Sequence, residues 1–200
     1  MDDVILLTLP EQKLPQVFTG LDGVRTLDQY AWSALSAPID APIAKAIIIT
    51  QHADQRHLSQ CSSQLQRHLD CGGRIHFNGH LLYPLFARVE SFKPLTAPRR
   101  HDFELTALKP HPVFNDVVVA NLSQRKGVHG FYGRGYMPLP AGATALTGLG
   151  PERLPIDWEW RFANNNGCLF VHAGNDLWTV SDDAELQRRL AFNIVQWCRG

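Results

Sequence analysis

A strand–helix–strand run between residues 44 and 77 restricts the fold of this chain more than any other feature. Residues 44–50 read Ala-Lys-Ala-Ile-Ile-Ile-Thr, and such a β-branched run is typical of an interior strand. Asp54 can cap the helix that follows. Its apolar stripe is Leu58, Cys61, Leu65 and Leu69. Gly72 and Gly73 end that helix before the next strand. A strand, a helix and a strand joined by short connections predict a parallel sheet, and therefore an α/β fold.

The two ends of the chain extend this pattern. Residues 4–9 form a short apolar run closed by Pro10, which fits a buried strand. A second buried strand is expected over residues 168–173. A final helix follows it, with Ser181 or Asp182 as its N-cap. Both ends therefore supply elements of the same sheet.

The remaining segments are less regular. We expect strands over residues 24–32 and 101–108, and a short β-type run at residues 117–119. Residues 143–149 and 156–162 are expected to pair as strands. We find no internal repeat and no linker, so the sequence predicts one domain over residues 1–200.

Composition excludes several classes of function. Lys plus Arg and Asp plus Glu both number 19, and this zero net charge argues against binding to nucleic-acid backbones. No apolar run approaches the roughly 18 residues of a membrane-spanning helix, so we expect no membrane association. Asp2 and Asp3 stand where a signal peptide would carry basic residues. We therefore expect a cytoplasmic protein.

Three segments resemble a known family. Residues 72–80 read Gly-Gly-Arg-Ile-His-Phe-Asn-Gly-His, similar to the glycine–strand–elbow passage of the class I glutamine amidotransferase-like superfamily. His111-Pro112-Val113-Phe114 resembles the His-Pro step of its ThuA-like branch. Residues 167–178 resemble the late strand of that branch, and the three segments follow the order of the family.

The resemblance implies a flavodoxin-like three-layer fold with a mainly parallel central sheet, and a link to carbohydrate metabolism. The amidotransferases carry a nucleophilic Cys at the elbow, where this chain reads Asn78-Gly79-His80. Because an amide cannot act as that nucleophile, glutamine hydrolysis is not expected.

Candidate site residues follow from where strands end. Ligands of parallel α/β sheets bind beyond the carboxyl ends of the strands. The catalytic candidates, which would transfer protons, are His80, His172 and Asp176. The substrate-binding candidates are His52, Asn78, Gly79 and Asn175. Each has a simpler interpretation: Asn78 with Gly79 can serve only to make a turn, His172 can be a buried core residue, and Asp176 can cap a loop.

Metal and cofactor sites are not predicted. His76 and His80 lie on or just past a strand, where four residues span about 13 Å, too far for one metal ion unless a tight turn at Gly79 shortens the gap. His57 and His68 are expected on the solvent side of their helix. No nucleotide-binding motif is present, so we expect no cofactor.

Two functional hypotheses remain open. The first is a domain that binds a small polar molecule, such as a carbohydrate, and acts on it by acid–base chemistry. The second is a non-catalytic module that binds a partner protein or a second copy of itself. The missing nucleophile favours the second, and the polar strand ends favour the first.

Overall fold

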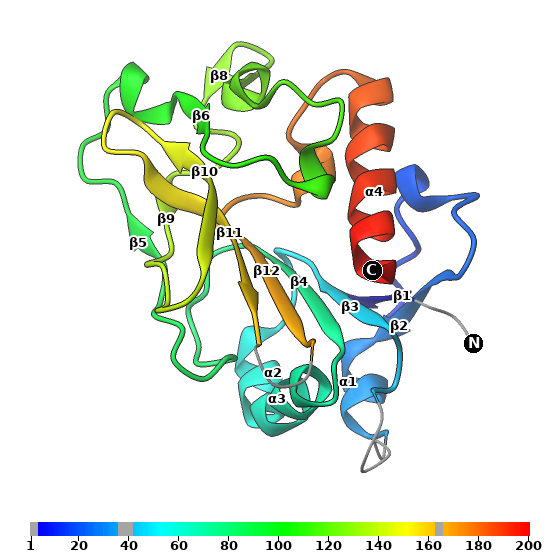
Figure 1. The fold of residues 1–200 in the computed structure, drawn as a ribbon. Coiled ribbons are helices and arrows are strands. Elements are labelled where there is room, and N and C mark those ends of the chain that lie inside the picture. Colours follow the sequence, from blue (N-terminus) through cyan, green and yellow to red (C-terminus); the bar gives the residue numbers. More distant parts are fainter. Residues whose placement is uncertain (1–3, 36–41, 163–165) are drawn as a thin grey trace.

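The computed structural model describes residues 4–35, 42–162 and 166–200, and its centre is an eight-stranded mixed sheet (Figure 1). Five neighbouring strands are parallel, in the order β2 (Val24–Asp28), β1 (Val4–Thr8), β3 (Ala46–Ile49), β4 (Arg74–Asn78) and β12 (Cys168–His172). The sheet continues antiparallel through β11 (Leu154–Arg161), β10 (Thr144–Leu149) and β6 (Leu105–Ala107). The predicted α/β fold with a mainly parallel sheet is confirmed.

Helices cover both faces of this sheet. Figure 1 shows α1 (Gln29–Ser33), α2 (Gln55–Gln60) and α3 (Ser62–Asp70) on one side and α4 (Ala184–Arg199) on the other. The strands β1, β3 and β12 are buried along their whole length, as expected for interior parallel strands covered on both faces. The fold is therefore three-layered, as predicted.

Short elements fill the connections. Two small antiparallel pairs are β5 (Lys93–Pro94) with β9 (Gly135–Tyr136), and β7 (Gln124–Arg125) with β8 (Val128–His129). The 3-10 helices are η1 (Gln16–Phe18), η2 (Arg100–Phe103), η3 (Pro112–Phe114), η4 (Val119–Ser123) and η5 (Leu177–Thr179).

Several element boundaries differ from those predicted. The strand expected over residues 24–32 ends at Asp28, because its carboxylate accepts the Tyr30 N–H and caps α1. The strand expected over 101–108 is a 3-10 helix followed by the short β6, and the run at 117–119 leads into a 3-10 helix. The strands expected over 143–149 and 156–162 do pair, as β10 and β11.

The cap of the last helix also differs. Asp183, and not Ser181 or Asp182, accepts the backbone N–H groups of Glu185 and Leu186 at the start of α4. Asp182 instead accepts hydrogen bonds from the side chain of Arg125 and the backbone of Lys126.

His68 is buried, which corrects the expectation of an exposed position. Its Nε2 lies 3.0 Å from the carbonyl oxygen of Arg74, where the chain turns from α3 into β4. A Cβ at Gly73 would lie 2.3 Å from the imidazole, so the glycine leaves room for this ring. Burial lowers the pKa of His68 to about 4.

Among the described residues, no helix is long and apolar enough to cross a bilayer. Residues 1–3, on which the expectation about a signal peptide rests, lie outside the described part of the chain.

Candidate functional site

The strands β3, β4 and β12 end side by side at one edge of the sheet. Ile49 is in register with Phe77, and His172 with Asn78. The backbone N–H of Gly79 then donates to the carbonyl of His172, at 3.0 Å, and joins the last two ends. The three predicted strand exits are therefore brought together.

Gly79 allows the chain to turn sharply at this edge. Its φ is +116°, a conformation that residues with a side chain rarely adopt. A Cβ at this position would lie 3.1 Å from Cα of Gln51, at the exit of β3. The turn and the close approach both favour glycine, so the structure supports the simpler interpretation of this residue.

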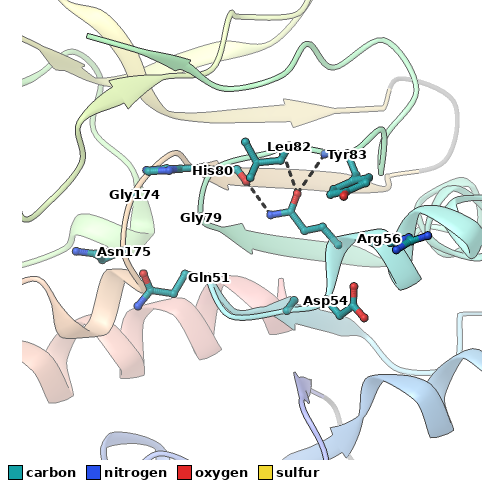
Figure 2. Close-up of a pocket in the computed structure, with 11 residues that line it drawn as sticks. Gln51, Asp54, Arg56, Gly79, His80, Leu82, Tyr83, Gly174 and Asn175 are labelled. Carbon is teal, nitrogen blue, oxygen red and sulfur yellow. Dashed lines mark hydrogen bonds between the residues drawn. The ribbon is translucent and has the colours of Figure 1, made fainter. Parts of the chain in front are cut away.

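A cleft of about 390 Å³ lies over these strand ends (Figure 2). Its walls come from the segment after β3, the segment after β4 and the segment after β12. The lining residues are Gln51, Ala53, Asp54, Gln55, Arg56, Gly79, His80, Leu82, Tyr83, Gly174 and Asn175. A cleft at the carboxyl ends of parallel strands is the place where α/β proteins bind ligands.

Gln55 holds one wall of the cleft in place. Its Nε2 donates to the carbonyl of His80 at 2.7 Å, and its Oε1 accepts the N–H groups of Leu82 and Tyr83 at 2.8 and 3.4 Å (Figure 2). The amide thus acts on the segment 80–83 as a neighbouring strand would. This side chain shapes the cleft and was not singled out from the sequence.

Asp54 caps α2 as predicted and also reaches α1. One carboxylate oxygen accepts the His57 N–H at 3.1 Å, and the other accepts the Tyr30 hydroxyl at 3.0 Å. The His57 N–H is the main cause that lowers the pKa of Asp54, which therefore remains ionised. Both oxygens are engaged within the protein.

Four of the seven predicted residues do not line the cleft. These are His52, Asn78, His172 and Asp176. His52 is exposed in the segment after β3. Asn78 is completely buried: its amide donates to the Ile49 carbonyl at 3.1 Å, and its oxygen accepts the Leu177 N–H at 3.1 Å. Asn78 therefore joins β3, β4 and η5 beneath the cleft.

Asp176 is also a support of the cleft. Its carboxylate is buried and accepts the backbone N–H of Gln51 at 2.8 Å, which connects the exits of β3 and β12. Burial raises the pKa of Asp176 to about 6, partly offset by the bond from Gln51.

His172 belongs to a buried polar network behind the cleft. Its Nδ1 lies 2.6 Å from one oxygen of Asp157, and the Tyr132 hydroxyl donates to the other at 2.6 Å. Thr147 also donates to that second oxygen. Burial, followed by the charge of Asp157, raises the pKa of Tyr132 well above its usual value.

The network is closed off from the cleft by Gly174. A Cβ there would lie 1.8 Å from the carbonyl oxygen of Tyr132 and 2.7 Å from Nε2 of His172. That nitrogen has no hydrogen-bond partner among the described residues, and His172 is fully buried. Direct proton transfer between His172 and a molecule in the cleft would require the Gly174 segment to move.

Three predicted residues do line the cleft: Gly79, His80 and Asn175. The His80 ring stacks on Phe92 with centroids 3.7 Å apart, and partial burial lowers its pKa. The Asn175 side chain donates to the Phe131 carbonyl at 2.6 Å. The only predicted proton carrier that reaches the cleft is therefore His80.

Across the described residues, no group of three or more His, Cys, Asp or Glu side chains is arranged to hold a metal ion. His76 is fully buried and shares a hydrogen bond with Asn78, whereas His80 is exposed beside the cleft. The two histidines therefore lie in different environments.

Comparisons with known proteins support the fold and nothing finer. No family model matches the chain, and no curated protein matches it. A solved structure described as the mmIFT52 N-terminal domain aligns with a TM-score of 0.54 and 14% identity, over 98% of this chain and 97% of that chain. At this identity the likeness concerns the fold alone.

These findings overturn the resemblance to the class I glutamine amidotransferase-like superfamily and its ThuA-like branch. No family match supports it, and the solved structure described above is an mmIFT52 N-terminal domain, which is neither an amidotransferase nor a carbohydrate-related protein. The expected link to carbohydrates is withdrawn with it. Two of the segments that suggested the family, residues 72–80 and 167–178, contain strands with the turns beside them, and the third is the 3-10 helix η3 capped by His111. Many α/β proteins share such features.

Proposed function

We propose that this domain binds a small polar molecule in the cleft at the ends of β3, β4 and β12, without the acid–base chemistry first assigned to His172 and Asp176. One observation carries the proposal. Side chains from three separated segments converge on the cleft, and several polar groups among them have no partner in the described part of the chain. These are the Gln51 amide, the Arg56 guanidinium, the His80 ring nitrogens and the Tyr83 hydroxyl.

The arrangement supports binding more than catalysis. A reaction by proton transfer needs an acid or base within hydrogen-bonding reach of the substrate. Asp176 is engaged with the Gln51 backbone, and His172 is separated from the cleft by Gly174. Polar groups held on firmly anchored segments suffice for recognition.

A thermal-shift screen of polar metabolites tests the proposal. We expect at least one compound to raise the melting temperature of the parent protein, because a ligand that binds the folded state stabilises it. The Gln51→Ala variant should lose this shift. Gln196→Ala, which removes an exposed glutamine from α4, is the matched control and should retain it.

Two outcomes would contradict the proposal. One is a screen in which no compound stabilises the parent. The other is a stabilising compound whose effect is unchanged in Gln51→Ala, because that ligand would bind elsewhere. Either result would direct attention to the alternative hypothesis of an interaction module, examined by the oligomeric state in solution.

A further inference from the structure

We infer that the cleft takes a small organic anion, with a carboxylate or phosphate group next to an apolar part. This inference rests on the binding function proposed above and adds the class of ligand.

The available charge in the cleft is positive. Arg56 is exposed at the cleft, and its guanidinium makes no hydrogen bond or ion pair within the described ranges. The opposite charge, on Asp54, already accepts one donor on each oxygen, from His57 and Tyr30. A guanidinium presents paired N–H donors that match the oxygens of a carboxylate or phosphate.

The mouth of the cleft is apolar. Leu82 is 66% exposed and Tyr83 is 42% exposed, which is unusual for adjacent large apolar side chains. Both belong to the segment that Gln55 anchors, so they are held at the cleft by hydrogen bonds to their own backbone N–H groups. An apolar group of a ligand can lie against them at little cost in ordering.

The remaining polar groups are neutral. Gln51 offers an amide, and His80 stacks on Phe92 in an environment that disfavours its protonated form. Both suit hydrogen bonding to an uncharged part of the ligand and add no second positive charge. The volume of about 390 Å³ falls in the range of small-molecule sites, roughly 300–1,000 Å³.

Six probes of related shape test the inference on the full chain. Phenylacetate and phenyl phosphate combine an anion with a ring. Phenylacetamide is a neutral analogue of phenylacetate and benzylamine is a cation, while acetate and inorganic phosphate lack the ring. Dissociation constants are measured by ligand titration followed by NMR.

We expect phenylacetate or phenyl phosphate to bind at least about ten-fold more tightly than the other four probes. The tighter of the two identifies the preferred anionic group. Arg56→Gln should reduce binding of the anionic ring compounds to the level of phenylacetamide. Arg188→Gln, which removes an exposed arginine of α4, is the matched control and should leave binding unchanged.

Several results would overturn the inference. Arg56 does not select an anion if phenylacetamide binds as tightly as phenylacetate, or if benzylamine binds more tightly. The same conclusion follows if Arg56→Gln binds the anionic ring compounds as tightly as the parent does. If acetate binds as tightly as phenylacetate, the ligand needs no apolar part. In these cases the proposed binding function is still supported if Gln51→Ala abolishes the stabilisation by some ligand of the metabolite screen. If no probe binds the parent, the inference fails, and the metabolite screen alone decides the proposed function.

Discussion

At the scale of single residues, two polar side chains predicted to belong to the site, Asn78 and Asp176, instead bind the backbone beneath the cleft. Asn78 satisfies a carbonyl at the end of β3 and an N–H of η5, and Asp176 satisfies the N–H of Gln51. The ends of buried strands leave such groups unpaired, and burying them without partners is costly. A polar residue after a strand is therefore as well explained by this need as by catalysis.

Asp176 gives a pH-dependent prediction. Its pKa is about 6 in the folded protein and ordinarily 3.8, so between these values the folded state binds more protons than the unfolded state. The free energy of unfolding should therefore fall as the pH rises from about 4 to 6, by up to about 3 kcal/mol. Asp176→Asn retains an acceptor for the Gln51 N–H and cannot ionise. We expect the variant to lose this fall and to exceed the parent in stability at pH 7.

Urea unfolding of parent and variant at several pH values between 4 and 7 measures this effect. Asp22→Asn makes the same change of charge at an exposed position and serves as the control. A constant difference in stability between parent and Asp176→Asn over the whole range would refute the prediction.

At the scale of elements, local signals set the approximate positions of strands and helices, and side-chain hydrogen bonds set their limits. The helix predicted after Asp54 is interrupted at Cys61, which ends α2 and precedes α3. Leu58, Leu65 and Leu69 of the predicted apolar stripe are fully buried on either side of this interruption, and Cys61 is partly buried against the core. The hydrophobic period thus predicted correctly which face of the helix is buried, but it did not predict the interruption at Cys61.

The segment after β4 gives a second prediction. Gln55→Ala removes the three hydrogen bonds that hold residues 80–83. We expect the Leu82 amide to exchange its hydrogen about ten-fold faster or more, which corresponds to roughly 1.4 kcal/mol of lost protection. Hydrogen exchange followed by NMR measures this rate.

Gln55→Glu should have an intermediate effect, because it keeps the acceptor for Leu82 but loses the donor to the His80 carbonyl. Gln60→Ala changes an exposed glutamine of the same helix and should leave the rate unchanged. An unaltered Leu82 rate in Gln55→Ala would show that other contacts hold the segment.

At the scale of the whole molecule, one sheet joins early and late parts of the chain. The strand β12 lies between β4 and β11, and α4 packs against elements at both ends of the sequence, including β1, η1 and η5. Such interleaving leaves no part of the sheet that could unfold alone without exposing buried strands. The prediction of one domain over residues 1–200 can therefore be tested by the cooperativity of unfolding.

We expect thermal unfolding in a single cooperative transition, with coincident curves from far-UV circular dichroism and tryptophan fluorescence. The five tryptophans that report it are buried in different parts of the fold: Trp32 in α1, Trp158 and Trp160 in β11, Trp178 in η5 and Trp197 in α4. Two separated transitions would instead indicate independent units within the chain.

The sequence by itself determined the α/β class, the main parallel strands and the edge of the sheet at which a cleft forms. These follow from hydrophobic period and local turn residues, which act between near neighbours in the chain. Only the tertiary structure decided which polar side chains face the cleft. Asp176 and Gln51 are 125 residues apart, and Gln55 and His80 are 25 apart. Whether such a side chain binds backbone or remains available to a ligand depends on partners that only folding brings within hydrogen-bonding distance.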